Sequence, residues 1–475
     1  MPRGLHSWGR RALPWLPPLP RRTRWALAAI LVVGLVLRVV WAVQMEPPQE
    51  LRDPVLYLIL ADHLAAGDGY RYGFEADQGV TAYYPPGYPL LLGGVTWLVR
   101  LLPGEVETFV AAVWTNVALS VATIGLVFVL GRRLAGPRVG LVAAAIWALW
   151  PNLVFHSGVA LTETLFLFLL VLLLVLLLGD RDAARAPGLV RLVAVGLLFG
   201  ATLLVRPVSA VIFPVFLVLW WANGVRGALW RLAVVGLATL AVLLPWSIRS
   251  TVAMDEPVAL SLNFGDNLCM GHNPDATGGF GDLGAHCYTA EGLRRPEAET
   301  RRQSENIDRA LTYVAEHPGT TLRRTPSKLR ITLQDDADGL HAAEDFGARP
   351  LFADTTRDRL DAIATGFYAL VGLLAVGGGV WWLRRSGGAR AVFLVVAGLV
   401  QLVPPLATFG DPRFKMPIYP TLAVCAAVAL VSLWDRRAPG GAPVPPDRRV
   451  AGPSAGDGDD VGGAEAAPPP ATTPA

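Results

Sequence analysis

The feature that most constrains this sequence is a series of long apolar runs, most of them joined by short connections that carry arginine. A helix needs about 20 apolar residues to cross the ~30 Å hydrocarbon core of a bilayer. In this chain 53% of the residues are hydrophobic and 17% are charged, whereas a soluble domain has about 25% charged residues. The sequence therefore predicts an all-α polytopic membrane protein. The ten predicted spans are residues 24–45, 108–131, 138–154, 161–179, 189–205, 207–222, 228–247, 361–383, 391–409 and 416–434.

The distribution of arginine predicts the orientation of these spans. Cytoplasmic connections of membrane proteins carry an excess of Lys and Arg. The run from Pro86 to Leu102 is apolar but short, and it contains Arg100. If this run does not cross the membrane, the arginine-rich connections all lie on the side of the basic N-terminus. We therefore interpret it as an interfacial or re-entrant helix on the outer face.

This orientation divides the chain into five regions. They are a basic cytoplasmic N-terminus (1–23), an N-terminal transmembrane region (24–248) with an external loop (46–107), an external α-rich loop domain (249–360), C-terminal transmembrane helices (361–434) and a cytoplasmic tail (435–475). The tail is expected to be disordered, because its Pro, Gly and Ala content leaves almost nothing to bury.

The external loop domain combines two kinds of sequence. Residues 261–290 are dense in Gly, Asn and Asp, which favours a loop that can hydrogen-bond a polar ligand. Residues 297–334 favour a pair of helices, which could bind a ligand or only support the loop. Cys269 and Cys287 lie in the same external segment, so a disulfide is possible there.

Several polar residues near the ends of spans are candidates for function. A charge in the bilayer costs at least ~2.5 kcal/mol, so such residues are rare and mostly functional. Each also has a structural interpretation: a helix-dipole partner, a snorkelling arginine, a neutralised turn or a packing histidine. In the predicted topology they share the outer face with the loop that carries Asp53. These residues are His156, Glu163, Arg206, Arg249, Asp411 and Arg413.

Other classes of function lack their sequence signals here. There is no P-loop, no GxGxxG after a strand and no Cys/His cluster with zinc spacing. The net charge of +3 comes from arginines placed between spans, which does not indicate a nucleic-acid-binding face.

In their order along the chain, several short motifs resemble the GT-C superfamily of polyprenyl-phosphate-sugar-dependent glycosyltransferases. The resemblance is to the family 39 type, which includes protein mannosyltransferases and the aminoarabinose transferase of lipid A. It covers about residues 24–434. The motifs are Asp53 with Tyr57, LADHLAAGDGY, YYPPGYPLLLG, TETLF, LLVRP, LLPWSIRS, NFGDNLCMGHNPDATG, AEHPGTTLRRTPSKL and GDPRFKMPIYP.

The resemblance implies an inverting sugar transfer at the extracytoplasmic face of the cell membrane. Asp53 would be the general base, and Arg206, Arg249 and Arg413 would hold the donor phosphate. The donor would be a polyprenyl-phosphate sugar in the membrane lipid, and the acceptor a glycan, glycolipid or protein. No nucleic acid and no cofactor are expected, although carboxylates such as Asp53 could share a divalent ion with the phosphate. Further site candidates are Tyr57, Tyr83, Tyr84, His156, Glu163, Asn267, Asn273 and Asp411.

Two departures leave the substrates open. Many relatives have a second acidic residue after the base, where this chain has Pro54. The aminoarabinose transferase has a charged pair where this chain has Tyr83 and Tyr84. Two other functions also remain: a flippase of lipid-linked sugars, for which no internal repeat is evident, and a non-catalytic assembly subunit of the same fold.

Overall fold

The computed structural model describes residues 19–50, 52–72, 79–104, 106–178, 187–221, 224–281, 286–289, 297–347, 350–386 and 388–437, and most of these residues are helical. No strand occurs among them, although two isolated β-bridges pair Arg71 with Val80 and Gly279 with Gly410. Residues 438–475 of the predicted tail and most of the predicted N-terminal region lie outside these residues, whereas residues 435–437 of the predicted tail belong to the last helix.

The helices fall into three stretches of chain. The first contains α1 (Arg21–Ala42), α2 (Asp53–Ala66), α3 (Gly87–Arg100), α4 (Thr108–Ala135), α5 (Pro137–Leu149), α6 (Pro151–His156), α7 (Glu163–Leu177), α8 (Leu189–Val205), the 3-10 helix η1 (Pro207–Val215), α9 (Phe216–Trp220) and α10 (Val225–Met254). The second contains α11 (Phe264–Gly271), α12 (Glu297–Glu316), α13 (Pro318–Leu333) and α14 (Asp338–Asp345). The third contains α15 (Asp354–Ser386), α16 (Ala389–Val400), α17 (Val403–Ala407), the 3-10 helix η3 (Pro412–Ile418) and α18 (Tyr419–Arg437).

The predicted fold class is confirmed. Among the described residues, six helical segments are long and apolar enough to cross a membrane, and they coincide with six of the predicted spans. The other four predicted spans coincide with shorter apolar helical segments, at 137–149, 163–177, 189–205 and 207–220. Large apolar side chains are exposed along the outer helices, for example Leu237 (68%) on α10 and Leu373 (75%) on α15. Such exposure fits contact with lipid rather than water.

Proline ends two of the helices close to polar residues. The residue before a proline is driven out of the α conformation. Trp150, before Pro151, has ψ of 111°, so the predicted span 138–154 divides there into α5 and α6. Arg206, before Pro207, has φ of −140° and ψ of 94°, and it ends α8. Trp150 is fully buried, and the Arg206 side chain is 13% exposed.

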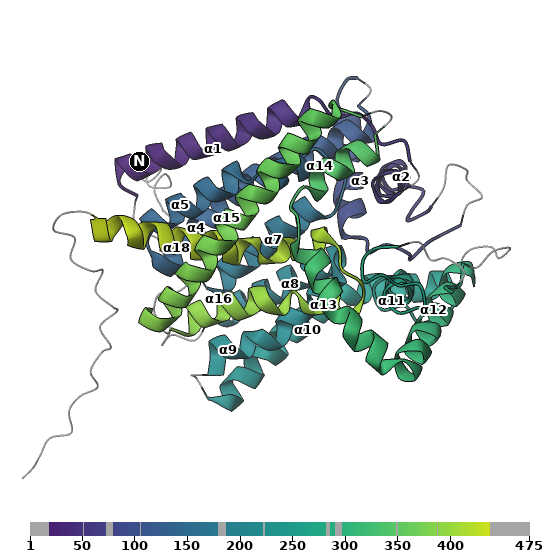
Figure 1. Cartoon of the computed structure of the whole chain (residues 1–475). Coiled ribbons are helices and arrows are strands. Elements are labelled where there is room, and N and C mark those ends of the chain that lie inside the picture. Colours follow the sequence, from purple (N-terminus) through teal and green to yellow (C-terminus); the bar gives the residue numbers. More distant parts are fainter. Residues whose placement is uncertain are drawn as a thin grey trace, which may run out of the picture. The chain divides into compact units, whose positions relative to one another are not determined.

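The segments that follow α1 and α10 gather at one end of the long helices, where α2, α11 and α12 lie (Figure 1). The turn before η3 reaches this group, since the Gly410 amide donates to the carbonyl of Gly278 at 2.8 Å. A Cβ on Gly410 would lie 2.2 Å from the Lys328 carbonyl oxygen, so only glycine fits this contact. The turn that leads into η3 and α18 is thereby held against α13 and the segment after α11.

A disulfide joins Cys269 at the end of α11 to Cys287. The third cysteine, Cys425, is free and buried in α18. A disulfide that closes a loop of this size stabilises a fold by about 3 kcal/mol. We expect the double substitution Cys269→Ser and Cys287→Ser to lower the melting temperature of the purified protein. Alkylation of the denatured wild type should add one label without reductant and three with it; three labels in both conditions would contradict the disulfide.

Candidate functional site

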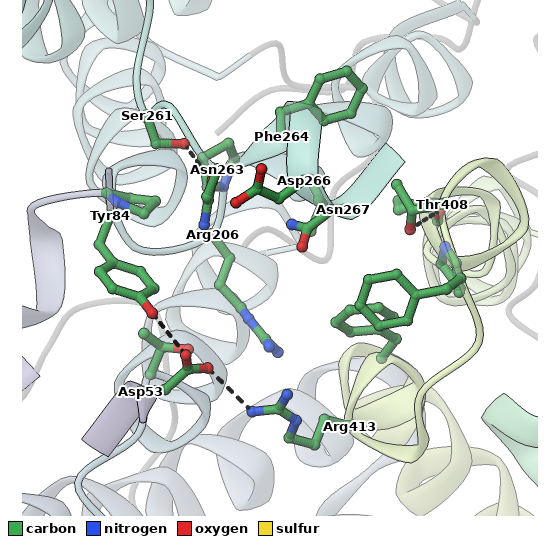
Figure 2. Close-up of a pocket in the computed structure, with 18 of the residues that line it drawn as sticks. Asp53, Tyr84, Arg206, Ser261, Asn263, Phe264, Asp266, Asn267, Thr408 and Arg413 are labelled. Atoms are coloured by element: carbon green, nitrogen blue, oxygen red, sulfur yellow. Dashed lines mark hydrogen bonds and ion pairs between the residues drawn. The ribbon is translucent and has the colours of Figure 1, made fainter. Parts of the chain in front are cut away.

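A cavity of about 430 Å³ lies where the segments that follow α1 and α10 meet the ends of the apolar helices. Its walls come from α2, the Tyr83-Tyr84-Pro85 loop, α7, the junction of α8 and η1, the segment around α11, α17 and η3. Figure 2 shows Asp53, Arg206 and Arg413 directing their polar groups into this space from three different elements. Eight of the candidates from the sequence line it: Asp53, Tyr57, Tyr83, Tyr84, Glu163, Arg206, Asn267 and Arg413.

Asp53 is the first residue of α2, and the following Pro54 suits the first turn of a helix. Its carboxylate accepts a hydrogen bond from the Tyr84 hydroxyl at 2.7 Å on Oδ1. Its other oxygen, Oδ2, lies 3.6 Å from Nη1 of Arg413. The side chain is 38% exposed, so one face of the carboxylate is open to a ligand.

Tyr84 is held in a cluster of aromatic rings. Its ring centroid lies 4.9 Å from that of Tyr57 and 4.9 Å from that of Tyr83. Burial, and then the negative charge of Asp53, raise the pKa of Tyr84 well above its ordinary value. The hydroxyl therefore stays protonated at neutral pH and acts as a donor that orients the carboxylate.

Arg206 projects from the end of α8 and pairs with Glu163, the first residue of α7, at 2.9 Å. Its guanidinium also lies over the rings of Phe166 and Phe414, 5.7 and 6.0 Å from their centroids. Gly87 brings the start of α3 against this helix end, because a Cβ there would lie 2.8 Å from the Leu204 carbonyl oxygen. The loop with the tyrosines is thus packed directly against the helix that carries Arg206.

Arg413 belongs to η3 and is positioned by Asp411. The Asp411 carboxylate caps η3 by accepting from the Arg413 backbone amide at 2.8 Å, and it also pairs with Nε at 3.3 Å. Asp411 itself does not line the cavity. Asp411 instead orients the side chain of Arg413, which does line the cavity.

Arg249 lies outside the cavity. Its guanidinium donates to the carbonyls of Thr81 at 2.7 Å and Tyr70 at 3.0 Å, and it lies 5.0 Å from the Trp246 ring. Glu299 contacts the same loop, because its carboxylate accepts a hydrogen bond from the Ala82 backbone amide at 3.0 Å. These contacts fix the approach to Tyr83 and Tyr84.

Asn273 and His156 are also remote from the cavity. The Asn273 amide donates to the Cys269 carbonyl at 2.8 Å and stabilises the end of α11. His156 belongs to a separate group of buried side chains, which we call the buried ion network. Its members are Asn152 and His156 of α6, Asp336 and Asp338 before and in α14, and Lys415 of η3, with Trp150 and Tyr419 at its edge.

In the buried ion network each carboxylate has several donors. Lys415 Nζ lies 3.1 Å from Asp336 Oδ1 and 3.8 Å from Asp338 Oδ1. The His156 imidazole contacts Asp338 Oδ2 at 2.6 Å, and Asn152 donates to Asp338 Oδ1 at 2.8 Å. Lys415 is 1% exposed and Asp336 is fully buried. The network joins α14 and the residues before it to α6 and to η3, which carries Arg413.

The sequence did not single out two further charged residues of the cavity. Asp266 accepts from the Tyr83 hydroxyl at 2.6 Å and pairs with Arg302 at 2.6 Å. Arg302 also lies 5.6 Å from the centroid of the Tyr83 ring. The only sequence signal for Asp266 is its place in the Gly- and Asn-rich loop. Arg302 stands in a charged helical stretch that offers no signal at all.

The cavity can therefore present one accessible carboxylate, that of Asp53, together with three guanidinium groups, those of Arg206, Arg302 and Arg413. The geometry suits a base that removes a proton next to a group of negative charge, such as a phosphate. Among the described residues, no group of three or more His, Cys, Asp or Glu side chains is placed to hold a metal ion.

Neither a protein-family model nor a curated protein matches the chain. Among solved structures, it is similar to the oligosaccharyltransferase AglB of Archaeoglobus fulgidus in complex with an inhibitory peptide and a dolichol-phosphate, with 15% identity and a TM-score of 0.48 over 88% of this chain and 51% of that one. It is also similar to ArnT from Cupriavidus metallidurans bound to undecaprenyl phosphate, with 15% identity and a TM-score of 0.39 over 87% and 79%. The chain spans about half the length of the oligosaccharyltransferase. At these identities the likenesses concern the fold alone.

Proposed function

We propose that this protein is an inverting glycosyltransferase that moves a sugar from a polyprenyl-phosphate donor to an acceptor outside the cytoplasm. The observation that carries the proposal is the meeting of Asp53, Arg206 and Arg413 in one cavity at the ends of apolar helices. A carboxylate there can act on a hydroxyl, while the arginines face a phosphate at the depth of lipid headgroups. Apolar lining residues such as Val208, Pro404 and Phe414 suit the first isoprene units.

In the proposed reaction Asp53 takes the proton of the acceptor hydroxyl as its oxygen attacks the anomeric carbon. The bond between that carbon and the phosphate oxygen breaks, and polyprenyl phosphate leaves with the electron pair. Attack opposite the leaving group inverts the anomeric configuration. Arg206 and Arg413 neutralise the charge that develops on the phosphate, as preorganised donors do best in a site shielded from water. Arg249 is assigned to the support of the loop, because its donors already face backbone carbonyls.

The proposed orientation places the cavity on the extracytoplasmic face of the cell membrane. The acceptor would enter past α11 and α12, and the donor would enter from the lipid between η1 and α17. The acceptor is a glycan, a glycolipid or a protein side chain, since each offers the hydroxyl that the base requires.

The hydroxyl of Tyr84 gives a first test of the base assignment. Tyr84→Phe keeps the ring contacts but removes the hydrogen bond to Asp53. A hydrogen bond to a charged group contributes about 1.5–3 kcal/mol, so we expect kcat to fall by at least about tenfold. Tyr313→Phe, at an external tyrosine outside the cavity, should leave turnover unchanged. Equal kcat values for Tyr84→Phe and wild type would contradict the orienting role.

The decisive experiment is transfer by the purified protein in liposomes that contain radiolabelled polyprenyl-phosphate sugars and a panel of acceptors. Release of unlabelled polyprenyl phosphate with formation of a labelled product would support the proposal. Movement of the intact lipid between leaflets without transfer would favour a flippase instead. Binding of the lipid with neither activity would favour a non-catalytic subunit.

A further inference from the structure

Gln401 ends α16 at the cavity and carries an unused hydrogen-bond donor. The residue is 3% exposed and lines the cavity, and its side-chain nitrogen Nε2 is buried without a hydrogen-bond partner. Buried polar groups are almost always paired, so each exception needs an explanation. An unpaired amide destabilises the folded protein. Because Gln401 also lines the cavity, a turn of its side chain that brings the amide to the cavity would let a ligand supply the missing partner.

The other strong donors of the cavity already have partners. Arg206 is paired with Glu163 at 2.9 Å, and Arg302 with Asp266 at 2.6 Å. Arg413 is paired with Asp411 at 3.3 Å. An anionic ligand must compete with these carboxylates for each guanidinium. Gln401 can donate without giving up any existing bond.

The surroundings of Gln401 narrow the class of ligand. It lies in the apolar segment 389–407, which is long enough to cross a membrane. Its nearest neighbours in sequence that also line the cavity are Pro404 and Pro405, which offer no side-chain hydrogen bond. A ligand that brings an acceptor to this depth must also bring an apolar part. A lipid phosphate satisfies both requirements.

We propose that Gln401 binds the polyprenyl-phosphate donor and product by donating its Nε2–H to a non-bridging phosphate oxygen. This inference rests on the proposed function, because it assigns a further contact to the same substrate. The unpaired amide of Gln401 would then destabilise the ligand-free protein and increase its affinity for the polyprenyl phosphate. The two quantities should therefore change in opposite directions when the amide is removed.

The variant Gln401→Met tests this, since methionine has a similar length and no donor. In phosphatidylcholine nanodiscs the empty variant should melt at the same temperature as the wild type or higher. Its affinity for undecaprenyl phosphate, measured by the shift in melting temperature with ligand, should fall at least tenfold. Thr96→Val is the matched control. Thr96 Oγ1 is also buried and unpartnered, but Thr96 does not line the cavity, so its removal should leave the affinity unchanged.

Three outcomes separate this inference from the proposed function. If undecaprenyl phosphate stabilises the wild type and Gln401→Met equally, the role of Gln401 is wrong and the proposed function stands. If it does not stabilise the wild type, the proposed donor is wrong and the inference fails with it. Inorganic phosphate and phosphatidic acid serve as further probes. A response to either that matches undecaprenyl phosphate, in wild type and variant alike, would overturn the assignment to the polyprenyl phosphate.

Discussion

Asp53→Asn is expected to abolish sugar transfer, with kcat lower by about 10²–10⁴-fold, the range that a general base contributes. Asparagine has the same shape, and its carbonyl oxygen can still accept the Tyr84 hydroxyl. The amide cannot take up a proton from the acceptor. The measurement is single-turnover transfer with saturating donor in liposomes.

The binding of the donor separates a lost base from a lost fold. Asp53→Asn also removes the carboxylate next to Arg413, so undecaprenyl phosphate should bind this variant at least as tightly as the wild type. Asp68→Asn is the control, because Asp68 follows the same helix, and its carboxylate is 55% exposed and lies 3.2 Å from the His63 imidazole. It should keep full activity. Turnover of Asp53→Asn near the wild-type value would show that another group removes the proton.

The positions of the membrane helices could be predicted because long apolar runs leave few alternatives. The ends of these helices were harder to predict. Arg206 and Arg249 both follow apolar runs near the outer face in the predicted topology, and the family resemblance implied the same role for both, which is to hold the donor phosphate. Pro207 ends α8 at Arg206, so that side chain enters the cavity. The residue directly after Arg249 is Ser250 rather than proline, and α10 continues to Met254, so the Arg249 guanidinium contacts a loop instead.

Partners that are distant in sequence could not be predicted from local pattern. Arg302 pairs with Asp266 because α12 packs against α11. No sequence motif in either segment indicates that contact. Gln401 stands inside the predicted span 391–409, where a single amide is unremarkable until its lack of a partner is seen. His156 was predicted as a candidate, but its carboxylate partner Asp338 lies 182 residues away. Periodicity determines which face of a helix is apolar, and only tertiary packing determines which polar groups meet.

Lys415→Met is expected to destabilise the protein by about 3–5 kcal/mol, the cost of removing one partner of a buried ion pair. Lys415 is 1% exposed and is the ammonium shared by Asp336 and Asp338 in the buried ion network. Without it two carboxylates remain close together in the interior. The measurement is thermal or denaturant unfolding in detergent, followed by intrinsic tryptophan fluorescence.

The loss should depend on pH. Burial raises the pKa of Asp336 to about 6, and the Lys415 ammonium opposes that rise, so the pKa of Asp336 is higher still in Lys415→Met. A carboxyl whose pKa is higher in the folded state than in the unfolded chain, where it is about 3.9, binds its proton more tightly when folded. Its protonation then stabilises the fold at low pH, and that contribution disappears as the pH rises through the folded pKa. Lys415→Met should therefore be more stable at pH 5 than at pH 8.

A surface pair gives the matched control. Arg138 pairs with Asp435 at 2.8 Å and is 76% exposed, and exposed pairs contribute about 0–1 kcal/mol. Arg138→Met should therefore unfold close to the wild type at both pH values. A loss of stability in Lys415→Met that is as small and as independent of pH would contradict the burial of the network.

Because Lys415 and Arg413 share η3, loosening this helix should also let the Arg413 guanidinium move away from Asp53. Transfer by Lys415→Met at a temperature where it remains folded should then show a raised KM for the donor, an effect that Arg138→Met cannot produce.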